Sequence, residues 1–329
     1  MTGPVWVLAD PRAGTAAQAL GIAERLGAAF ETVELEWGPW ARLPLRWGSL
    51  AGLGRGVRAR FVPPWPGLVI SAGRRSAPVA LWLGRRGARL VHCMWPGFAR
   101  GFDLLVVGRH DDPPAAPNLL PILGATHRMS PARLAAAREE FAAVAALPAP
   151  RVALLVGGRP RAEGMEPAVA GGIAAQVAGF AGTVLATSSR RTGREAEDAM
   201  AAALAAGPHR LHRWGAAGAN PYAGFLAWAD AIVVTGDSTS MISEALATAA
   251  PVFIADPGGL GARHRRLHES LYAAGQARPL ADAPAPFARA ALDESGRVAA
   301  EIRARLMSWG AEFTSRQCRD PPRPPTSFF

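Results

Sequence analysis

Short apolar runs and helical patterns alternate along most of this chain. In the first half, runs typical of buried strands lie at residues 5–9, 30–35, 68–70, 90–94 and 104–107. Apolar residues at helical spacing predict helices over 16–26, 78–83 and 131–147, and Ser130 followed by Pro131 is a typical start for the last of these. Strands that alternate with helices predict parallel sheets covered by helices, the α/β class.

A proline-rich link, Pro148-Ala149-Pro150, interrupts this pattern, which then restarts. Strand-like runs follow at 152–156, 184–187, 231–234 and 251–255, and helical patterns near 267–274 and 299–306 close the fold. Each half begins with a strand that runs into a glycine-containing turn, like two similar nucleotide-binding folds in series. We therefore expect two Rossmann-like domains, residues 1–148 and 151–310, followed by a disordered proline-rich tail over 319–329.

Composition narrows the class of protein. The chain has 329 residues, of which 50% are hydrophobic and 19% charged, and this suits a soluble protein of two domains. It contains neither an apolar run of about 18 residues nor a secretory signal. Cys93 and Cys318 suggest no disulfide, so we expect a cytoplasmic location.

Charge narrows the class of partner. The net charge of +10 rests on arginine alone among the basic side chains and favours anionic partners such as a nucleotide or a lipid head group. We do not expect nucleic acid, because zinc-finger spacing and an RNA-binding aromatic signature are absent from the sequence. No paired-acid motif indicates a metal, since Asp111-Asp112 lies in a proline-rich loop, so we expect neither a metal nor another cofactor.

The stretch from Thr235 to Ala245 is the most informative part of the chain. It lies between two apolar runs, in the order strand, polar turn, helix, strand. A turn of Gly, Ser and Thr at a helix start offers free N–H groups and the positive end of the helix dipole to an anion, usually phosphate. Glu244, about two turns into the helix, can face the same crevice and accept hydrogen bonds from sugar hydroxyls. The alternative is that Asp237 or Ser238 only caps the helix and that Glu244 is solvated.

Three turns of the second half are expected to meet at one sheet edge, because ligands of open parallel sheets bind outside the carboxyl ends of the strands. They are Gly157-Gly158, the run 187–192 and the run 235–238. Arg190 and Arg191 suit a diphosphate, because guanidinium groups make paired hydrogen bonds to phosphate oxygens. A solvated helix start is the alternative for these two arginines. Further on, Asn220 is expected to cap a helix, and a contact with a base is the weaker alternative.

These residues resemble a known family. The resemblance rests on the run 187–192, Asn220-Pro221-Tyr222, Ala229-Asp230 and the pattern Thr-Gly-Asp-Ser-x-x-Met-x-x-Glu-Ala over 235–245, and in the first half on Asp10, Arg12, Gly14, Gln18, 72–75 and Phe102-Asp103. Over residues 5–280 the chain is similar to the mitochondrial-fission ELM family, a group of plant and bacterial proteins that resemble glycosyltransferases. The resemblance implies the GT-B fold, in which two Rossmann-like domains with parallel sheets face a cleft.

The resemblance also implies a role for each domain. The C-terminal domain would hold a nucleotide-sugar donor, with Glu244 on the ribose, and the N-terminal domain would hold the acceptor. The last helix would cross back onto the N-terminal domain. The arrangement is also similar to that of the transferase that adds N-acetylglucosamine to the lipid-linked peptidoglycan precursor. The residues expected to bind the donor are Gly157, Gly158, Ser188, Arg190, Arg191, Thr235, Gly236, Ser238, Thr239 and Glu244.

One feature departs from the transferase pattern. Enzymes of this type often carry a His in the first glycine-rich turn, whereas the corresponding place here, near Thr15, has none. Asp10 is the nearest ionisable candidate for the general base, and capping of the turn is its alternative role. The scattered histidines His92, His110 and His127 are expected to be structural. GT-B enzymes generally need no metal, because positive side chains and helix ends stabilise the leaving diphosphate.

Aromatic and basic side chains gather between residues 37 and 65, and no acid follows Glu36 in this stretch. They are Trp37, Trp40, Trp47, Trp65, Arg42, Arg46, Arg55, Arg58 and Arg60. Such a mixture suits a bilayer interface with anionic lipid. We expect contact with the inner face of a membrane through Trp37, Trp40, Arg42, Arg46 and Trp47. The alternative is a partly buried loop packed on its own domain.

We therefore predict a glycosyltransferase of the hexosyltransferase type. It would move a sugar from a nucleoside diphosphate sugar to a glycan or lipid-linked acceptor, such as the lipopolysaccharide core or another envelope glycan. A nucleotide-sugar epimerase of the same fold is a second hypothesis. A membrane-surface interaction protein that kept the fold and lost the chemistry is a third. Sugar transfer, donor isomerisation and absence of nucleotide binding distinguish the three.

Overall fold

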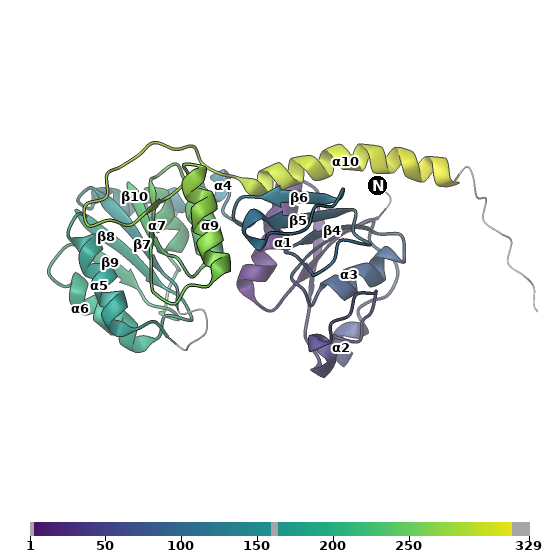
Figure 1. The fold of residues 1–329 in the computed structure, drawn as a ribbon, viewed down its shortest axis with the longest axis horizontal. Helices are drawn as coiled ribbons and strands as arrows, with labels where there is room; N and C mark the ends of the chain where they lie inside the picture. The colour runs from purple at the N-terminus through teal and green to yellow at the C-terminus, as the bar shows by residue number, and fades with distance from the viewer. Residues whose placement is uncertain (1–2, 159–163, 318–329) are drawn as a thin grey trace, which may run out of the picture. The chain divides into compact units, whose positions relative to one another are not determined.

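The structure, a computed structural model, describes residues 3–158 and 164–317. Helices and strands alternate, and the strands form two six-stranded parallel sheets (Figure 1). The α/β class predicted from the sequence is therefore confirmed. The tail over 319–329, predicted to be disordered, lies outside the described residues. Every helix in the described part of the chain is too short or too polar to cross a membrane.

The first sheet has the strand order β2-β1-β3-β4-β5-β6. Its strands are β1 (Val5–Ala9), β2 (Phe30–Glu34), β3 (Leu68–Ala72), β4 (Arg89–Cys93), β5 (Leu104–Gly108) and β6 (Leu119–Ile122). The helices between them are α1 (Ala13–Leu26), α2 (Arg55–Arg58) and α3 (Ala77–Gly84), with short 3₁₀ turns at Pro39–Arg42 and Arg109–Asp111. Every residue of β1 and β3 is buried, as expected for central strands of a parallel sheet.

The second sheet has the order β12-β11-β10-β7-β8-β9, which is that of a Rossmann fold. Its strands are β7 (Arg151–Val156), β8 (Thr183–Ser188), β9 (His209–His212), β10 (Ala231–Thr235), β11 (Val252–Ala255) and β12 (Arg278–Pro279). The helices are α4 (Pro131–Glu140), which precedes β7, then α5 (Pro167–Ala178), α6 (Arg194–Leu204), α7 (Tyr222–Trp228), α8 (Thr239–Ala245), α9 (Ala262–Ala273) and α10 (Glu294–Gln317). The strand order reverses between β7 and β10.

Alternate residues of β7 divide between two hydrophobic cores. Ala153 and Leu155 pack in a cluster with apolar residues of α8 and α9. Leu154 and Val156 pack in another cluster, with apolar residues of α5 and α6. Neighbouring residues of a strand point to opposite faces, so helices cover both faces of this sheet.

The described residues divide into two compact units. The first takes in those of Met1–His92, Pro96–Leu105 and Ser295–Phe329, and the second those of Cys93–Trp95 and Val106–Glu294. Helix α10 belongs to the first unit from Ser295 onward, and Arg303 Nη1 donates to the carbonyl oxygen of Arg25 at 2.8 Å. The expected return of the last helix to the N-terminal part of the chain is therefore confirmed. The domain boundary at residues 148–150 stays a prediction.

Some elements differ from the predicted ones. The helix predicted over 131–147 starts as expected, because Ser130 Oγ accepts a hydrogen bond from Arg133 N at 2.9 Å, but it ends at Glu140. Phe141 leaves helical geometry and packs its ring against α7, where a Cβ on Gly224 would lie 2.5 Å from the ring, and a 3₁₀ turn follows. Strands β6, β9 and β12 were not predicted; they are short and carry polar or proline residues.

Candidate functional site

The three turns singled out in the sequence follow three neighbouring strands. Gly157-Gly158 follows β7, the run 189–192 follows β8, and the run 236–238 follows β10. Strand β7 lies between β8 and β10 in parallel register, so the three carboxyl ends share one edge. This edge includes the point where the strand order reverses, and open α/β sheets bind their ligands at such points.

The carboxylate of Asp237 joins the three turns. Its side chain is completely buried, and it accepts hydrogen bonds from the turns after β7 and β8 and from the last residue of β10. Gly158 N donates to Oδ2 at 2.9 Å, Thr235 Oγ1 donates to Oδ1 at 2.8 Å, and Arg191 Nη2 donates to Oδ2 at 2.9 Å. The sequence suggested only a cap role for Asp237. The cap is Ser238, whose Oγ accepts from Met241 N at 3.4 Å.

The two glycines after β7 allow the turns after β8 and β10 to pack closely against them. A Cβ on Gly157 would lie 2.5 Å from Asp237 Oδ1, and one on Gly158 would lie 2.4 Å from the carbonyl oxygen of Arg191. Their N–H groups also have partners inside the protein, because Gly157 N donates to Thr235 Oγ1 at 2.8 Å and Gly158 N donates to Asp237. Donor binding by these glycines stays a prediction, and any contact they make with a donor must use something other than these N–H groups.

The end of β8 and the turn after it contain some side chains whose polar groups are used inside the protein and others that are exposed. Ser188 Oγ donates to Glu197 Oε1 at 2.5 Å and accepts from Trp214 N at 2.7 Å, so its polar group is used internally. Arg191 is held by Asp237 while 40% of its side chain stays exposed. Arg190 is exposed and forms no ion pair with the described residues. Two guanidinium groups therefore remain for an anion at this edge, one of them fixed in direction.

The turn after β10 is closely packed. Gly236 lies against His268. The Nε2 of His268 donates to the carbonyl oxygen of Gly236 at 2.8 Å, and a Cβ on Gly236 would lie 2.5 Å from the His268 ring. Burial lowers the pKa of His268. Thr239 begins α8, which has only seven residues. The dipole of so short a helix is a minor source of positive potential beside the arginines.

Glu244 is half-buried and has a specific partner, which argues against a solvated side chain. Tyr222 OH donates to Glu244 Oε2 at 2.7 Å, and Oε1 makes no hydrogen bond within the described residues. Burial raises the pKa of Glu244, and the hydrogen bond from Tyr222 opposes this rise. Burial, and then the nearby Glu244 carboxylate, raises the pKa of Tyr222 well above its usual value. Tyr222 follows Asn220, whose Oδ1 accepts from Tyr222 N at 3.0 Å as the predicted cap.

Ser243, one of the residues of the 235–245 pattern, fixes α8 to another segment of the second unit. Its Oγ donates to the carbonyl oxygen of Thr239 at 2.7 Å and accepts from Ala125 N at 2.9 Å. Gly124 allows this approach, because a Cβ there would lie 2.7 Å from Ser243 Oγ and its φ is +82°. The sequence pattern contained this serine but no signal for its partner.

Asp10 is buried at the carboxyl end of β1 and both of its oxygens are engaged. Oδ1 accepts from Arg12 N at 2.8 Å, and Oδ2 accepts from Trp37 Nε1 at 3.0 Å. This geometry fits the alternative role of Asp10, which is to order the turn before α1. Burial also lowers the pKa of His92 to about 3 and that of His110 to about 4, so these rings are neutral at neutral pH. No group of three metal-ligating side chains occurs among the described residues.

The tryptophan-rich stretch divides into inward and outward rings. Trp37 is half-buried and its Nε1 donates to Asp10, so its predicted membrane contact stays a prediction. Trp65 packs edge-on against Trp82, with ring centroids 5.5 Å apart. Trp40 and Trp47 are 59% and 57% exposed, and Arg42 and Arg46 are exposed beside them in the sequence. The predicted surface is therefore smaller than the whole stretch.

Comparisons with known proteins identify the family and the fold. The family described as Mitochondrial fission ELM1 matches residues 13–306. The Mitochondrial fission protein ELM1 of Arabidopsis thaliana is 26% identical over 301 residues, which cover 79% of this chain and 68% of that protein.

Two solved structures share the fold. UDP-GlcNAc 2-epimerase from Methanocaldococcus jannaschii has a TM-score of 0.50 and 10% identity over 93% of this chain and 99% of its own. Arabidopsis thaliana UGT89C1 complexed with quercetin has a TM-score of 0.50 and 11% identity over 92% of this chain and 89% of its own. With the two parallel sheets, these likenesses confirm the GT-B-like fold.

The role of Asp237 can be measured as stability. Asp237→Ala should lower the free energy of unfolding by about 1–3 kcal/mol, because it leaves the buried Gly158 N–H without a partner. Asp198→Ala is the control; Asp198 pairs with Arg213 on the surface and is 60% exposed, so its loss should cost no more than about 1 kcal/mol. Urea unfolding of both variants measures the difference. Equal losses would contradict the central role of Asp237.

Proposed function

This chain belongs to the mitochondrial fission ELM1 family, and we propose that it is a glycosyltransferase. In this proposal it binds a nucleoside diphosphate sugar at the carboxyl edge of the second sheet and transfers the sugar to a glycan or lipid-linked acceptor. The observation that carries the proposal is the meeting of three turns where the strand order reverses, with Arg191 held at this edge by Asp237.

Arg191 and Arg190 would bind the diphosphate. Asp237 uses one N–H group of Arg191, and a guanidinium has about five, so several remain for phosphate oxygens. The three donors to Asp237 compensate its charge, so it repels a diphosphate less than a free carboxylate would. Negative charge grows on the diphosphate as the sugar leaves, and a guanidinium already held in place stabilises this charge without reorganisation.

Glu244 would bind the ribose. Tyr222 occupies Oε2, and the second oxygen is left to accept hydrogen bonds from sugar hydroxyls. The acceptor would bind to the N-terminal part of the chain, where Asp10 is the proposed general base. Trp40, Trp47, Arg42 and Arg46 would touch anionic lipid at the cytoplasmic face of a membrane.

The direct test is incubation of the full chain with uridine and guanosine diphosphate sugars and candidate acceptors. Release of free nucleoside diphosphate together with a glycosylated product is the expected result. Isomerised donor without transfer would replace the proposal with an epimerase. Absence of nucleotide binding in calorimetry would contradict both activities and leave a surface interaction role.

Glu244→Gln should weaken nucleotide binding without unfolding the protein. The variant keeps an acceptor for the Tyr222 hydroxyl but loses the charge that strengthens bonds from ribose hydroxyls, so nucleotide affinity should fall by about 1–3 kcal/mol. Glu195→Gln, at an exposed site on α6, is the control.

The raised folded-state pKa of Glu244 also makes the stability depend on pH. The contribution of the Glu244 carboxyl to stability is present below its ordinary pKa of 4.5 and is lost as pH rises through the folded-state pKa.

The variant should therefore melt at or above the wild-type temperature at pH 7, and this advantage should disappear near pH 4. Calorimetric titration and thermal melts at both pH values measure the two effects. An affinity equal to that of the wild type would remove Glu244 from the proposed donor site.

Asp10→Asn tests the proposed base. An amide oxygen can still accept from Arg12 N, but the side chain cannot take a proton. The transfer rate should therefore fall by about 10²–10⁴-fold while donor affinity is unchanged. A lower melting temperature with an unchanged rate would show that Asp10 serves only to hold Arg12 and Trp37.

Vesicle co-sedimentation tests the membrane contact. Each exposed arginine near anionic lipid contributes about 1 kcal/mol, and salt screens this attraction. Binding to vesicles that contain phosphatidylglycerol should fall with salt and fall again in Arg42→Glu with Arg55→Glu. The same reversal at Arg109 and Arg194, which are exposed in the second unit, is the control. Equal binding to neutral and anionic vesicles would contradict the electrostatic contact.

A further inference from the structure

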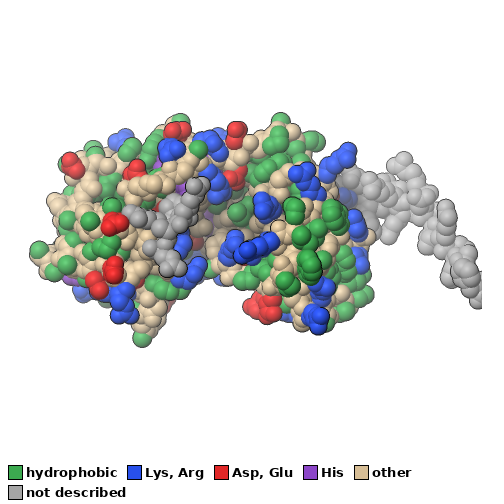
Figure 2. Space-filling view, turned by 60° about the horizontal axis from the view of Figure 1, so that its bottom comes forward, with side chains coloured by type: hydrophobic (Ala, Val, Ile, Leu, Met, Phe, Trp, Pro, Cys, Tyr) green, Lys and Arg blue, Asp and Glu red, His purple; other side chains and the backbone are tan. Residues whose placement is uncertain are grey.

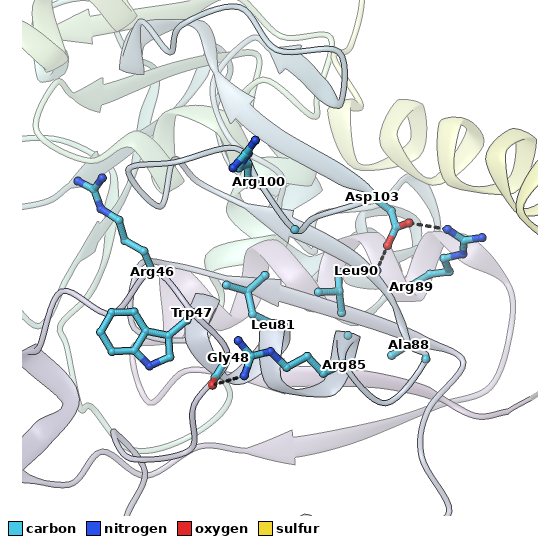
Figure 3. Close-up of a pocket in the computed structure, with 13 residues that line it drawn as sticks. Arg46, Trp47, Gly48, Leu81, Arg85, Ala88, Arg89, Leu90, Arg100 and Asp103 are labelled. Carbon is cyan, nitrogen blue, oxygen red and sulfur yellow. Dashed lines mark hydrogen bonds and ion pairs between the residues drawn. The ribbon is translucent and has the colours of Figure 1, made fainter.

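A cavity of about 730 Å³ lies in the first unit, whereas the proposed donor edge belongs to the second. Figure 3 shows it between the end of α3, the beginning of β4 and the loop that carries Arg46 and Trp47. Arg89 and Leu90 open β4, so the cavity lies at the amino ends of strands. Open parallel sheets bind their usual ligands at the carboxyl ends, so this cavity is a separate feature.

Four arginines and one acid line the cavity. The Asp103 carboxylate is fully engaged, because Arg89 Nη1 donates to Oδ1 at 2.8 Å and Leu90 N donates to Oδ2 at 2.7 Å. Arg85 reaches only the carbonyl oxygen of Gly48, at 3.5 Å. Arg46 and Arg100 are exposed and pair with no carboxylate of the described residues. Three positive charges around the cavity are therefore not neutralised by an acid.

The sequence around the cavity strengthens this imbalance. Residues 37–102 contain eleven arginines and no Asp or Glu, while the rest of the chain has 25 arginines against 26 acids. The net positive charge of the protein thus arises from this one segment, which supplies all four cavity arginines. Figure 2 shows arginine side chains among hydrophobic ones on the surface of the first unit. A segment of this kind attracts anions over a distance and concentrates them locally.

The lining of the cavity also includes apolar side chains. In Figure 3, Leu81 and Leu90 lie between Trp47 at one end and the Asp103–Arg89 pair at the other. Trp47 is 57% exposed, so the face of its ring is available to a ligand. Gly84 and Gly101 leave room for these leucines, because a Cβ on either would come within 2.7 Å or 2.6 Å of a leucine methyl group.

The loop with Arg46 and Trp47 is fixed in place on α3. Ser49 N donates to the carbonyl oxygen of Pro78 at 2.9 Å. A Cβ on Gly48 would lie 2.8 Å from backbone atoms of Trp82, so the loop backbone rests directly on the helix. The cavity wall is therefore part of the packed fold of the first unit.

We propose that this cavity binds a phosphate group carried by a molecule with an apolar portion. Arg46, Arg85 and Arg100 supply guanidinium groups that match phosphate oxygens with paired hydrogen bonds. The partly exposed Leu81 side chain and the Trp47 ring cover the apolar portion. The site needs neither a sugar donor nor catalysis, so it goes beyond the proposed transfer reaction. Its ligand comes either from solution, as a phosphate ester, or from a membrane, as a lipid head group.

Calorimetry on the full chain tests the site. The probes are soluble dihexanoyl phosphatidic acid, dihexanoyl phosphatidylcholine with the same chains, and inorganic phosphate. We expect the phosphatidic acid to bind more tightly than the other two. Arg85→Ala with Arg100→Ala should weaken its binding by about tenfold or more, the scale of charge-assisted hydrogen bonds. The control, Arg109→Ala with Arg194→Ala, removes the same charge from the second unit. It should change the affinity for phosphatidic acid by less than about twofold.

Two further measurements complete the test. Arg100→Glu alone leaves the Arg85 contact with Gly48 intact and should weaken binding in a folded protein. Vesicles containing phosphatidic acid distinguish the sources: loss of vesicle binding in the double variant indicates a head group, and loss confined to soluble esters indicates a ligand from solution.

The proposal is overturned if phosphatidic acid does not bind, or binds equally to the wild type and both cavity variants. If inorganic phosphate binds as tightly as phosphatidic acid, the proposed recognition of an apolar portion is overturned. Nucleotide-sugar affinity should be unchanged in the double variant, so the donor proposal succeeds or fails separately.

Discussion

The buried carboxylate of Asp237 is the interaction on which the candidate site depends. Its donors Gly158 and Arg191 lie 79 and 46 residues away in the sequence, on turns after different strands. A buried charge is costly unless it is paired and hydrogen-bonded, and here one donor from each turn offsets that cost. The same contacts bring the strand ends together and direct the Arg191 guanidinium, so architecture and anion recognition rest on one group.

Local sequence patterns predicted much of the fold. The central strands are mostly apolar and end in small polar turns, so β7, β8 and β10 and the turns after them could be placed before their neighbours were known. The edge strands β9 and β12 could not, because solvent relaxes the requirement for apolar residues there. The partners of Gly157, Gly158 and Asp237 depend on β7 lying beside β10, which is a long-range choice. The glycine pair after β7 was therefore predicted to bind the donor, and nothing in the sequence indicated that the fold uses its N–H groups internally.

Two separate signals in the first half of the chain prove to be one contact. The sequence indicated Asp10 as an ionisable group and Trp37 as an aromatic ring near arginines, and the structure joins them by a hydrogen bond of 3.0 Å. Tryptophan has an apolar body and one N–H donor, so it serves equally well inside a fold and at a lipid interface. Composition can identify a stretch rich in such rings. Only packing decides that Trp37 and Trp65 point inward while Trp40 and Trp47 remain exposed.

The two units rely on positive charge in different ways. In the second unit, acids nearly balance arginines and the important guanidinium is held by a buried carboxylate, so direction rather than total charge determines which anion fits. In the first unit, eleven arginines occur without an acid across residues 37–102, and three of those around the cavity, Arg46, Arg85 and Arg100, are exposed. Salt screens exposed charges over about 8 Å at physiological ionic strength and affects buried pairs much less. Ionic strength therefore acts mainly on the arginine-rich segment, while the Asp237–Arg191 pair keeps its geometry because three turns of the fold enforce it.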